Sequence, residues 1–289
     1  MKIETKHVKV SYAKNRSLSD MNVTIDDGIT IISGINGVGK SSMISVLEGL
    51  AKIEGKDGVT LGKYLPYYNP DFAFRDVAFL PERPIPIGGI TVMDWIEFYS
   101  GIRKISLERL RKIMEEFGIY GLRKERFKYL SMGETQLVSL SICLSTECSF
   151  FVLDEPNANI DLENRNILAN IIQNLRQEYG MSFLITSHIL DDLLPIAENI
   201  ILFRKDSIIG PIALKKTFGE NLFSMKFREL DQVVKLIEGK IKYAIDSNSI
   251  KIKDEDFSNF ISSMNEKQIG SLMSIISIPR IMEDDIPDV

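Results

Sequence analysis

The chain has 289 residues, of which 44% are hydrophobic and 26% are charged, and its formal net charge is −5. The length suits one large domain, or one domain of about 200 residues followed by a smaller one. The acidic balance disfavours a nucleic-acid-binding protein, which usually presents a basic face. Two cysteines are too few for a disulfide scaffold, so we expect buried free thiols. No uninterrupted apolar run approaches the ~18 residues of a membrane span, so we expect any membrane-embedded component to be a separate chain.

The first motif along the chain is a phosphate-binding loop. Residues 2–12 and 21–25 alternate as strands do, and residues 28–32 form an apolar strand that leads into Gly34-Ile35-Asn36-Gly37-Val38-Gly39-Lys40-Ser41-Ser42. The sequence fits the pattern G-x-x-x-x-G-K-[ST], and the residues after it predict a helix. Such a turn points backbone N–H groups and a helix dipole at one anion. We expect nucleotide contacts from Gly34, Asn36, Gly37, Gly39, Lys40, Ser41 and Ser42.

Two of these side chains have specific expected roles. The ammonium of Lys40 would neutralise charge on the β- and γ-phosphates, and the hydroxyl of Ser41 would ligate Mg²⁺.

The middle of the chain is predominantly helical. A short strand is expected at residues 77–80, and helical patterns fill most of residues 91–147. Thr91, Ser106 and Ser131 each stand where a helix would begin, and their hydroxyls are good N-caps.

An acidic strand supplies the second chemical element. Four apolar residues, 150–153, precede Asp154, Glu155 and Pro156. A run of this kind is typical of a strand buried in a parallel sheet, and ligands bind at the carboxyl end of such sheets. Asp154 would act on Mg²⁺, and Glu155 could polarise an attacking water.

These elements predict the fold class. A helix at 162–179 and a buried strand at 181–186 continue an alternation of strand and helix. We therefore expect an α/β phosphate-loop NTPase with a mostly parallel sheet, an N-terminal antiparallel β part and a helical subdomain at about residues 88–147. The main domain would span residues 1–218.

The last 71 residues change character. Residues 219–289 show the order β-α-β-β-α-β, with strands at 222–227, 240–245, 249–253 and 272–278, which is the split βαβ pattern. We expect a small accessory α+β domain; the alternative is an appendage packed on the main domain.

Taken together, the motifs resemble the ATP-binding cassette (ABC) family over about residues 2–210. The order matches: an aromatic residue, Tyr12; the phosphate loop; a mid-chain loop containing Glu82; the L-S-x-G signature beginning at Leu130; the acidic strand; and a histidine, His188. The resemblance implies that two such domains pair head to tail, with each ATP held between one phosphate loop and the other chain's signature.

The resemblance also implies roles for individual residues. Tyr12 would stack on adenine, His188 would contact the γ-phosphate and the water, Glu82 would help to bind Mg²⁺, and Asp161 would couple the two sites. Ser131, Gly133 and Glu134 would contact the partner's ATP. Three positions depart from the family pattern: Glu82 and Glu134 stand where glutamine is usual, and Met132 where glycine is usual.

The implied function is that of an ATP-hydrolysing subunit of a transporter, with ATP and Mg²⁺ as ligands. Its partners would be a second ATP-binding subunit, in a homodimer, and an integral membrane permease, which would place it in the cytoplasm on the inner face of the membrane. Residues 91–129 and the preceding loop, with Ile87, Ile90 and Trp95, could receive the permease or simply belong to the core. The terminal region resembles the accessory region of drug, bacteriocin and polysaccharide exporters, which favours export.

The alternative function is a non-transport ABC ATPase that acts on the ribosome, nucleic acid or chromosomes. The roughly 90 residues between phosphate loop and signature show no sustained heptads, unlike the chromosome type. The chain carries one cassette rather than two, and it is acidic.

Overall fold

The computed structural model describes residues 2–12, 16–34, 37–51, 53–54, 58–69, 75–84, 89–187, 189–190, 192–203, 208–213, 221–227, 230–237, 243–246, 249–253 and 272–279. The chain divides into two compact units, Met1–Ile212 and Ala213–Val289. Each unit is described by itself.

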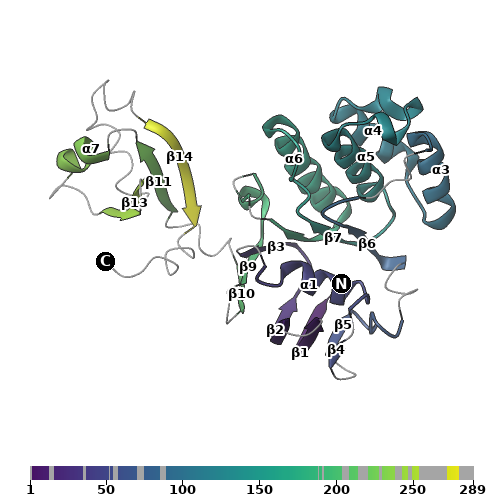
Figure 1. Ribbon diagram of the computed structural model, residues 1–289, viewed down its shortest axis with the longest axis horizontal. Coiled ribbons are helices and arrows are strands. Elements are labelled where there is room, and N and C mark those ends of the chain that lie inside the picture. Colours follow the sequence, from purple (N-terminus) through teal and green to yellow (C-terminus); the bar gives the residue numbers. More distant parts are fainter. Residues whose placement is uncertain are drawn as a thin grey trace. The chain divides into compact units, whose positions relative to one another are not determined.

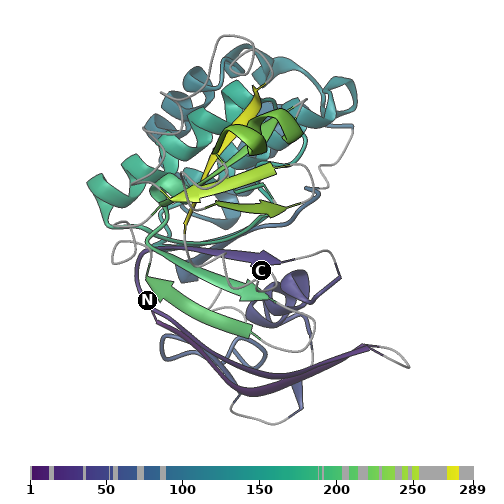
Figure 2. The same cartoon turned by 90° about the vertical axis from the view of Figure 1, so that its left-hand side faces the viewer.

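A six-stranded sheet forms the centre of the first unit, in the order β10-β9-β3-β8-β7-β6. Pairing is parallel from β9 through to β6. In the view of Figure 1, the helices α5 (Met132–Leu144) and α6 (Leu162–Tyr179) lie over one face of this sheet and α1 (Lys40–Leu47) over the other, and Figure 2 agrees. The predicted parallel α/β class is confirmed. The strands are β3 (Ile29–Gly34), β6 (Val77–Leu80), β7 (Phe150–Asp154), β8 (Ser182–Thr186), β9 (Asn199–Phe203) and β10 (Ile208–Ala213).

The central strands are buried on both faces. Every residue of β7 and β8 is buried. Phe151 and Phe183 pair across the two strands, and their rings stack with centroids 5.0 Å apart. This arrangement explains why both strands are apolar runs rather than alternating ones.

A smaller antiparallel sheet contains the N-terminus, as predicted. Its order is β2-β1-β4, and β5 also pairs with β1. Apolar side chains of this sheet, of α1 and of the central sheet form one continuous core, so α1 is enclosed between the two sheets. The elements are β1 (Ile3–Tyr12), β2 (Arg16–Ile25), β4 (Ile53–Glu54), β5 (Val59–Leu61) and α1 (Lys40–Leu47).

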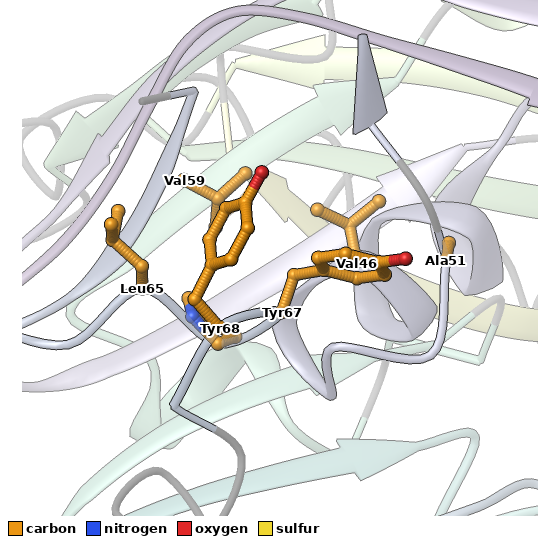
Figure 3. A pocket seen from close by; sticks show the side chains of 7 residues that line it. Val46, Ala51, Val59, Leu65, Tyr67 and Tyr68 are labelled. Carbon is orange, nitrogen blue, oxygen red and sulfur yellow. The ribbon is translucent and has the colours of Figure 1, made fainter. Parts of the chain in front are cut away.

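The segment after β5, unassigned from the sequence, folds back on α1. Tyr67 and Tyr68 meet edge to face at 5.3 Å and border a small apolar hollow (Figure 3). Gly49 permits this approach, because a Cβ there would lie 2.7 Å from the carbonyl oxygen of Pro66. The hollow is also lined by Val46, Ala51, Val59 and Leu65.

The helices of the helical region begin at the positions that the sequence predicts. Thr91 accepts a hydrogen bond from the N–H of Asp94 and forms a capping box, and Ser106 accepts one from Arg109. Trp95 is half-buried, stacks on Phe98 and meets Phe127 edge to face. The helices are α3 (Val92–Ile102), α4 (Leu107–Glu116), α5 (Met132–Leu144) and α6 (Leu162–Tyr179), with 3₁₀ turns at Tyr120–Lys124, Phe127–Tyr129 and Leu194–Ile196. Within the described ranges, no helix combines the length and apolarity that crossing a membrane requires.

The second unit contains an antiparallel sheet in the order β12-β13-β11-β14. The first strand thus lies between the third and the fourth, as the split βαβ arrangement requires. Buried apolar residues of α7, β11 and β13 form its core. The second helix of the predicted pattern, around residues 257–264, lies outside the described residues. The elements are β11 (Asn221–Phe227), α7 (Leu230–Ile237), β12 (Tyr243–Asp246), β13 (Ser249–Lys253) and β14 (Leu272–Pro279).

The stacked phenylalanines yield a stability prediction. Phe183→Ala removes a fully buried ring, and we expect the free energy of unfolding to fall by about 3–5 kcal/mol. Tyr129→Ala, at a side chain that is 69% exposed, should change it by less than about 0.5 kcal/mol. Equal values for the two variants in chemical denaturation would contradict the assigned core.

Candidate nucleotide-binding site

The phosphate loop connects β3 to α1, as predicted. Gly39 is the N-cap of α1 and has a left-handed backbone (φ 111°), which a side chain would disfavour. The cap makes no side-chain hydrogen bond. The first-turn N–H groups of α1 are therefore not satisfied by a capping side chain, as an anion site requires. Asn36 lies outside the described residues.

Lys40 is only 6% exposed at the start of α1. Its Nζ donates a hydrogen bond to the carbonyl oxygen of Gly34 at 2.6 Å and lies 4.0 Å from Oε1 of Glu155. An ammonium has three N–H donors. Lys40 can therefore keep the bond to Gly34 while it donates to a phosphate.

Asp154 ends β7 and Glu155 directly follows it, and they are 7% and 8% exposed. The hydroxyl of Thr186, on the neighbouring strand β8, donates to Oδ1 of Asp154. The N–H of Glu155 donates to the carbonyl oxygen of Thr186 at 3.1 Å and is 3.0 Å from its hydroxyl. Thr186 thus holds both acidic residues.

Sequence reasoning missed Thr186. The available signal was a polar residue at the end of the buried strand 181–186. Only the parallel register, which places Thr186 opposite Asp154, shows what this side chain touches.

The electrostatics of this edge favour a cation. Lys40, Asp154 and Glu155 together carry two negative charges and one positive charge, and buried charge is costly unless it is neutralised. Burial, and then the charge of Asp154, raises the pKa of Glu48 at the end of α1. The negative charge of Asp154 therefore affects Glu48 as well as Thr186, which donates a hydrogen bond to it.

The residues present fit a Mg²⁺ ion only together with substrate oxygens. Within the described part of the chain, no three His, Cys, Asp or Glu side chains are placed to hold a metal. Mg²⁺ is usually bound by one or two carboxylates plus phosphate oxygens, which suits Asp154 and Ser41. Glu82 follows β6 at the same edge of the sheet; it is exposed, and its Oε1 lies 3.7 Å from Nε of Arg83.

The loops after β7 and β8 are joined through Asn157, which is 1% exposed. Its Nδ2 donates to the carbonyl oxygen of Ile189 at 2.9 Å, and its Oδ1 accepts from the hydroxyl of Ser187 at 2.9 Å. His188, between these two anchors, lies outside the described residues. So does the side chain of Tyr12, whose backbone ends β1.

Asp161 caps α6. Its Oδ1 accepts from the N–H of Asn164 at 2.9 Å, and hydrogen bonds from the backbone and side chain of Asn164 lower the pKa of Asp161. The structure thus shows a local role for Asp161 at the start of α6.

The signature begins α5. Ser131 is the N-cap, its Oγ accepts from the N–H of Glu134 at 3.2 Å, and the carboxylate of Glu134 accepts from the N–H of Ser131 at 2.7 Å. Glu134 at the usual glutamine position therefore completes a capping box, which the pattern S-x-x-E could have predicted. Met132 is 69% exposed beside it.

This fold and this site define a phosphate-loop ATPase of the ATP-binding cassette class. The family model described as ABC transporter matches residues 18–158. The chain is an ATP-binding subunit of the ABC transporter type, an ATPase whose hydrolysis of ATP drives transport.

Similar proteins agree with this assignment. A Pyrococcus furiosus protein, provisionally named an ABC transporter ATP-binding protein, is 29% identical over 214 residues, which are 71% of this chain and 81% of that protein. The molybdate/tungstate import ATP-binding protein WtpC of Thermococcus kodakarensis is 26% identical over 232 residues, covering 78% of this chain and 70% of that protein. A solved dimeric bacterial ABC transporter cassette shares the fold, with a TM-score of 0.64 at 19% identity over 73% of this chain and 98% of that chain.

The capping box yields a prediction on pH. The hydrogen bond from the backbone N–H of Ser131 lowers the pKa of Glu134 below its ordinary value of 4.5. A lowered folded-state pKa adds stability above the unfolded pKa, and this is lost as pH falls through the folded value. Relative to Glu134→Gln, the wild type should be more stable at pH 7 by less than about 1 kcal/mol, and the difference should vanish in acid.

Denaturant unfolding between about pH 7 and pH 3 tests this window. Glu147→Gln, at an exposed position, is the control and should show no such change. A pH-independent difference for Glu134→Gln would contradict the assigned role of the carboxylate.

Proposed function

We propose that the phosphate loop and the acidic strand form the catalytic half of an ATP site. The observation that carries this proposal is the burial of Lys40, Asp154 and Glu155 at one edge of the sheet, with Lys40 Nζ between Gly34 and Glu155. Main-chain N–H groups of the loop and the Lys40 ammonium bind the β- and γ-phosphates. Glu155 orients the attacking water and accepts its proton.

Asp154 and Ser41, with Glu82 from the neighbouring loop, would hold Mg²⁺. The ion would supply positive charge to the β- and γ-phosphate oxygens. His188 would contact the γ-phosphate, and Tyr12 would stack on adenine.

The other half of the site comes from a second copy of the chain. Ser131 is exposed at the start of α5, and its hydroxyl hydrogen stays available for donation although its oxygen serves the cap. The relative solved as a dimeric cassette supports this pairing. Ser131, Gly133 and Glu134 would then face the partner's ATP, and Asp161 would couple the two sites.

The permease would dock on α3. Met93, Phe98 and Ile102 of this helix are 42%, 55% and 53% exposed, which is unusual for apolar side chains of this size. Trp95 and Ile90, expected there from the sequence, are half-buried, and Ile87 lies outside the described residues. Docking on a permease would place the protein on the cytoplasmic face of the membrane.

Export stays a prediction. The Thermococcus relative carries a name that states import, so the comparison does not support the exporter type. Direction is a property of the permease, and transport assays in vesicles of known orientation would decide it.

Glu155→Gln tests the catalytic proposal. The amide cannot accept a proton but keeps nearly the same volume, so we expect ATP binding to persist and turnover to fall by at least about 100-fold. A long-lived ATP-bound dimer should accumulate and be visible by light scattering.

Lys40→Ala is the matched variant. It removes the ammonium from the phosphate site, so ATP affinity itself should fall. Wild-type turnover in Glu155→Gln would exclude Glu155 as the base, and unchanged ATP affinity in Lys40→Ala would exclude the phosphate-loop assignment.

Ser131→Ala and Thr91→Ala separate capping from ATP contact. Both hydroxyls belong to capping boxes, so each change should lower the free energy of unfolding by about 1 kcal/mol. Only Ser131→Ala should also lower ATPase turnover, because only Ser131 would face the partner's ATP. Equal turnover in the two variants would show that Ser131 only caps the helix and does not contact the partner's ATP.

A further inference from the structure

Glu155 has an unfavourable backbone conformation. Its φ is 47°, in the left-handed region that residues other than glycine rarely adopt. Such a conformation persists only where the surrounding structure enforces it. The hydrogen bonds from its N–H to Thr186 fix one side of the residue. On the C-terminal side of Glu155, the backbone is held by contacts of the residues that follow it.

One of these contacts comes from the signature helix. Gln136 is 2% exposed, and its Nε2 donates to the carbonyl oxygen of Pro156 at 3.3 Å. Pro156 directly follows Glu155. The bond therefore joins the first turns of α5 to the residue next to the proposed catalytic base.

A second contact of α5 lies one turn earlier. A Cβ at Gly133 would be 2.9 Å from the carbonyl oxygen of Asn159. The backbone of α5 therefore lies directly against the loop that follows the acidic strand. Asn157, a residue of the same loop, ties it to the loop after β8 through hydrogen bonds with Ser187 and Ile189.

We infer that Gln136 is a positioning residue for hydrolysis, which fixes the loop of Glu155 against α5. This inference rests on the proposed role of Glu155. Ser131 begins the same helix, so α5 joins the half-site formed within the chain to the surface offered to the partner's ATP. Displacing Pro156 would turn Glu155 away from the attacking water without moving the phosphate loop.

Gln136→Met tests the inference in the full-length chain. Methionine keeps the length and apolar contacts of the side chain but has no N–H donor. We expect kcat to fall by about 10- to 100-fold, while KM and the Kd for the fluorescent analogue MANT-ATP change by less than about threefold. Gln136→Glu should lose at least as much kcat, because its carboxylate oxygen faces the Pro156 carbonyl.

Ser139→Ala is the control variant. It removes a hydroxyl of α5 whose bond, to the carbonyl oxygen of Thr135, stays within the helix. Its kcat should equal that of the wild type. If Gln136→Met fails to fold by circular dichroism, Gln136→Asn repeats the test, since it keeps the amide but withdraws the donor by one methylene.

Three outcomes overturn the inference. A folded Gln136 variant with the kcat of Ser139→Ala would leave Gln136 no role in hydrolysis. Parallel losses of MANT-ATP affinity and kcat would show that Gln136 supports the whole site. Restoration of kcat in Gln136→Glu would show that the donated hydrogen bond is not needed. Absence of turnover in the wild type would instead overturn the proposed function.

Discussion

The Lys40 ammonium, 2.6 Å from the Gly34 carbonyl oxygen and 4.0 Å from Glu155, is the interaction on which the site depends. It brings a buried positive charge to the edge of the sheet where two buried carboxylates lie, Asp154 at the end of β7 and Glu155 just after it. Without it, Asp154 and Glu155 would stand close together with no compensating ammonium, which is costly in a region of low dielectric. The same charge is then available to a phosphate.

The caps of the helices decide where an anion can bind. Side chains of Thr91, Ser106, Ser131 and Asp161 cap α3, α4, α5 and α6, whereas Gly39 offers α1 no side-chain cap. A side-chain cap satisfies one of the first N–H groups of a helix, and a glycine cap leaves them to a ligand. Among these five helices, the one that begins at Lys40 is thus suited to bind a phosphate within its own chain. The α5 helix offers instead the hydroxyl hydrogen of Ser131.

The loop after β7 contains both the strained backbone of Glu155 and the proposed catalytic carboxylate. The left-handed conformation of Glu155 costs roughly 1–3 kcal/mol. Its N–H donates to Thr186, and in the residues that follow it Gln136 donates to Pro156 and Asn157 donates to Ile189. Thr186 lies on β8 and Gln136 on α5, so two of these residues belong to elements other than β7 and its loop. The conformation of the acidic residue is therefore a property of the assembled domain rather than of its own segment.

The sequence by itself determined what depends on neighbours in the chain. The glycine-rich turn before Lys40, the apolar run before Asp154, and the helix starts at Thr91, Ser106 and Ser131 are local signals, since spacing and capping act over a few residues. They were enough for the fold class and the ATPase assignment. The roles of Glu155, Ser131 and Asp161 in ATP binding and hydrolysis stay predictions.

Only the tertiary structure decided the contacts between distant segments. Thr186 meets Asp154 through strand register, and Gln136 reaches Pro156 across 20 residues. The region after β5, with its packing of Tyr67 near α1, also had no local signal. Such pairings are set by the collective packing of sheets and helices, and no short stretch of sequence carries that information.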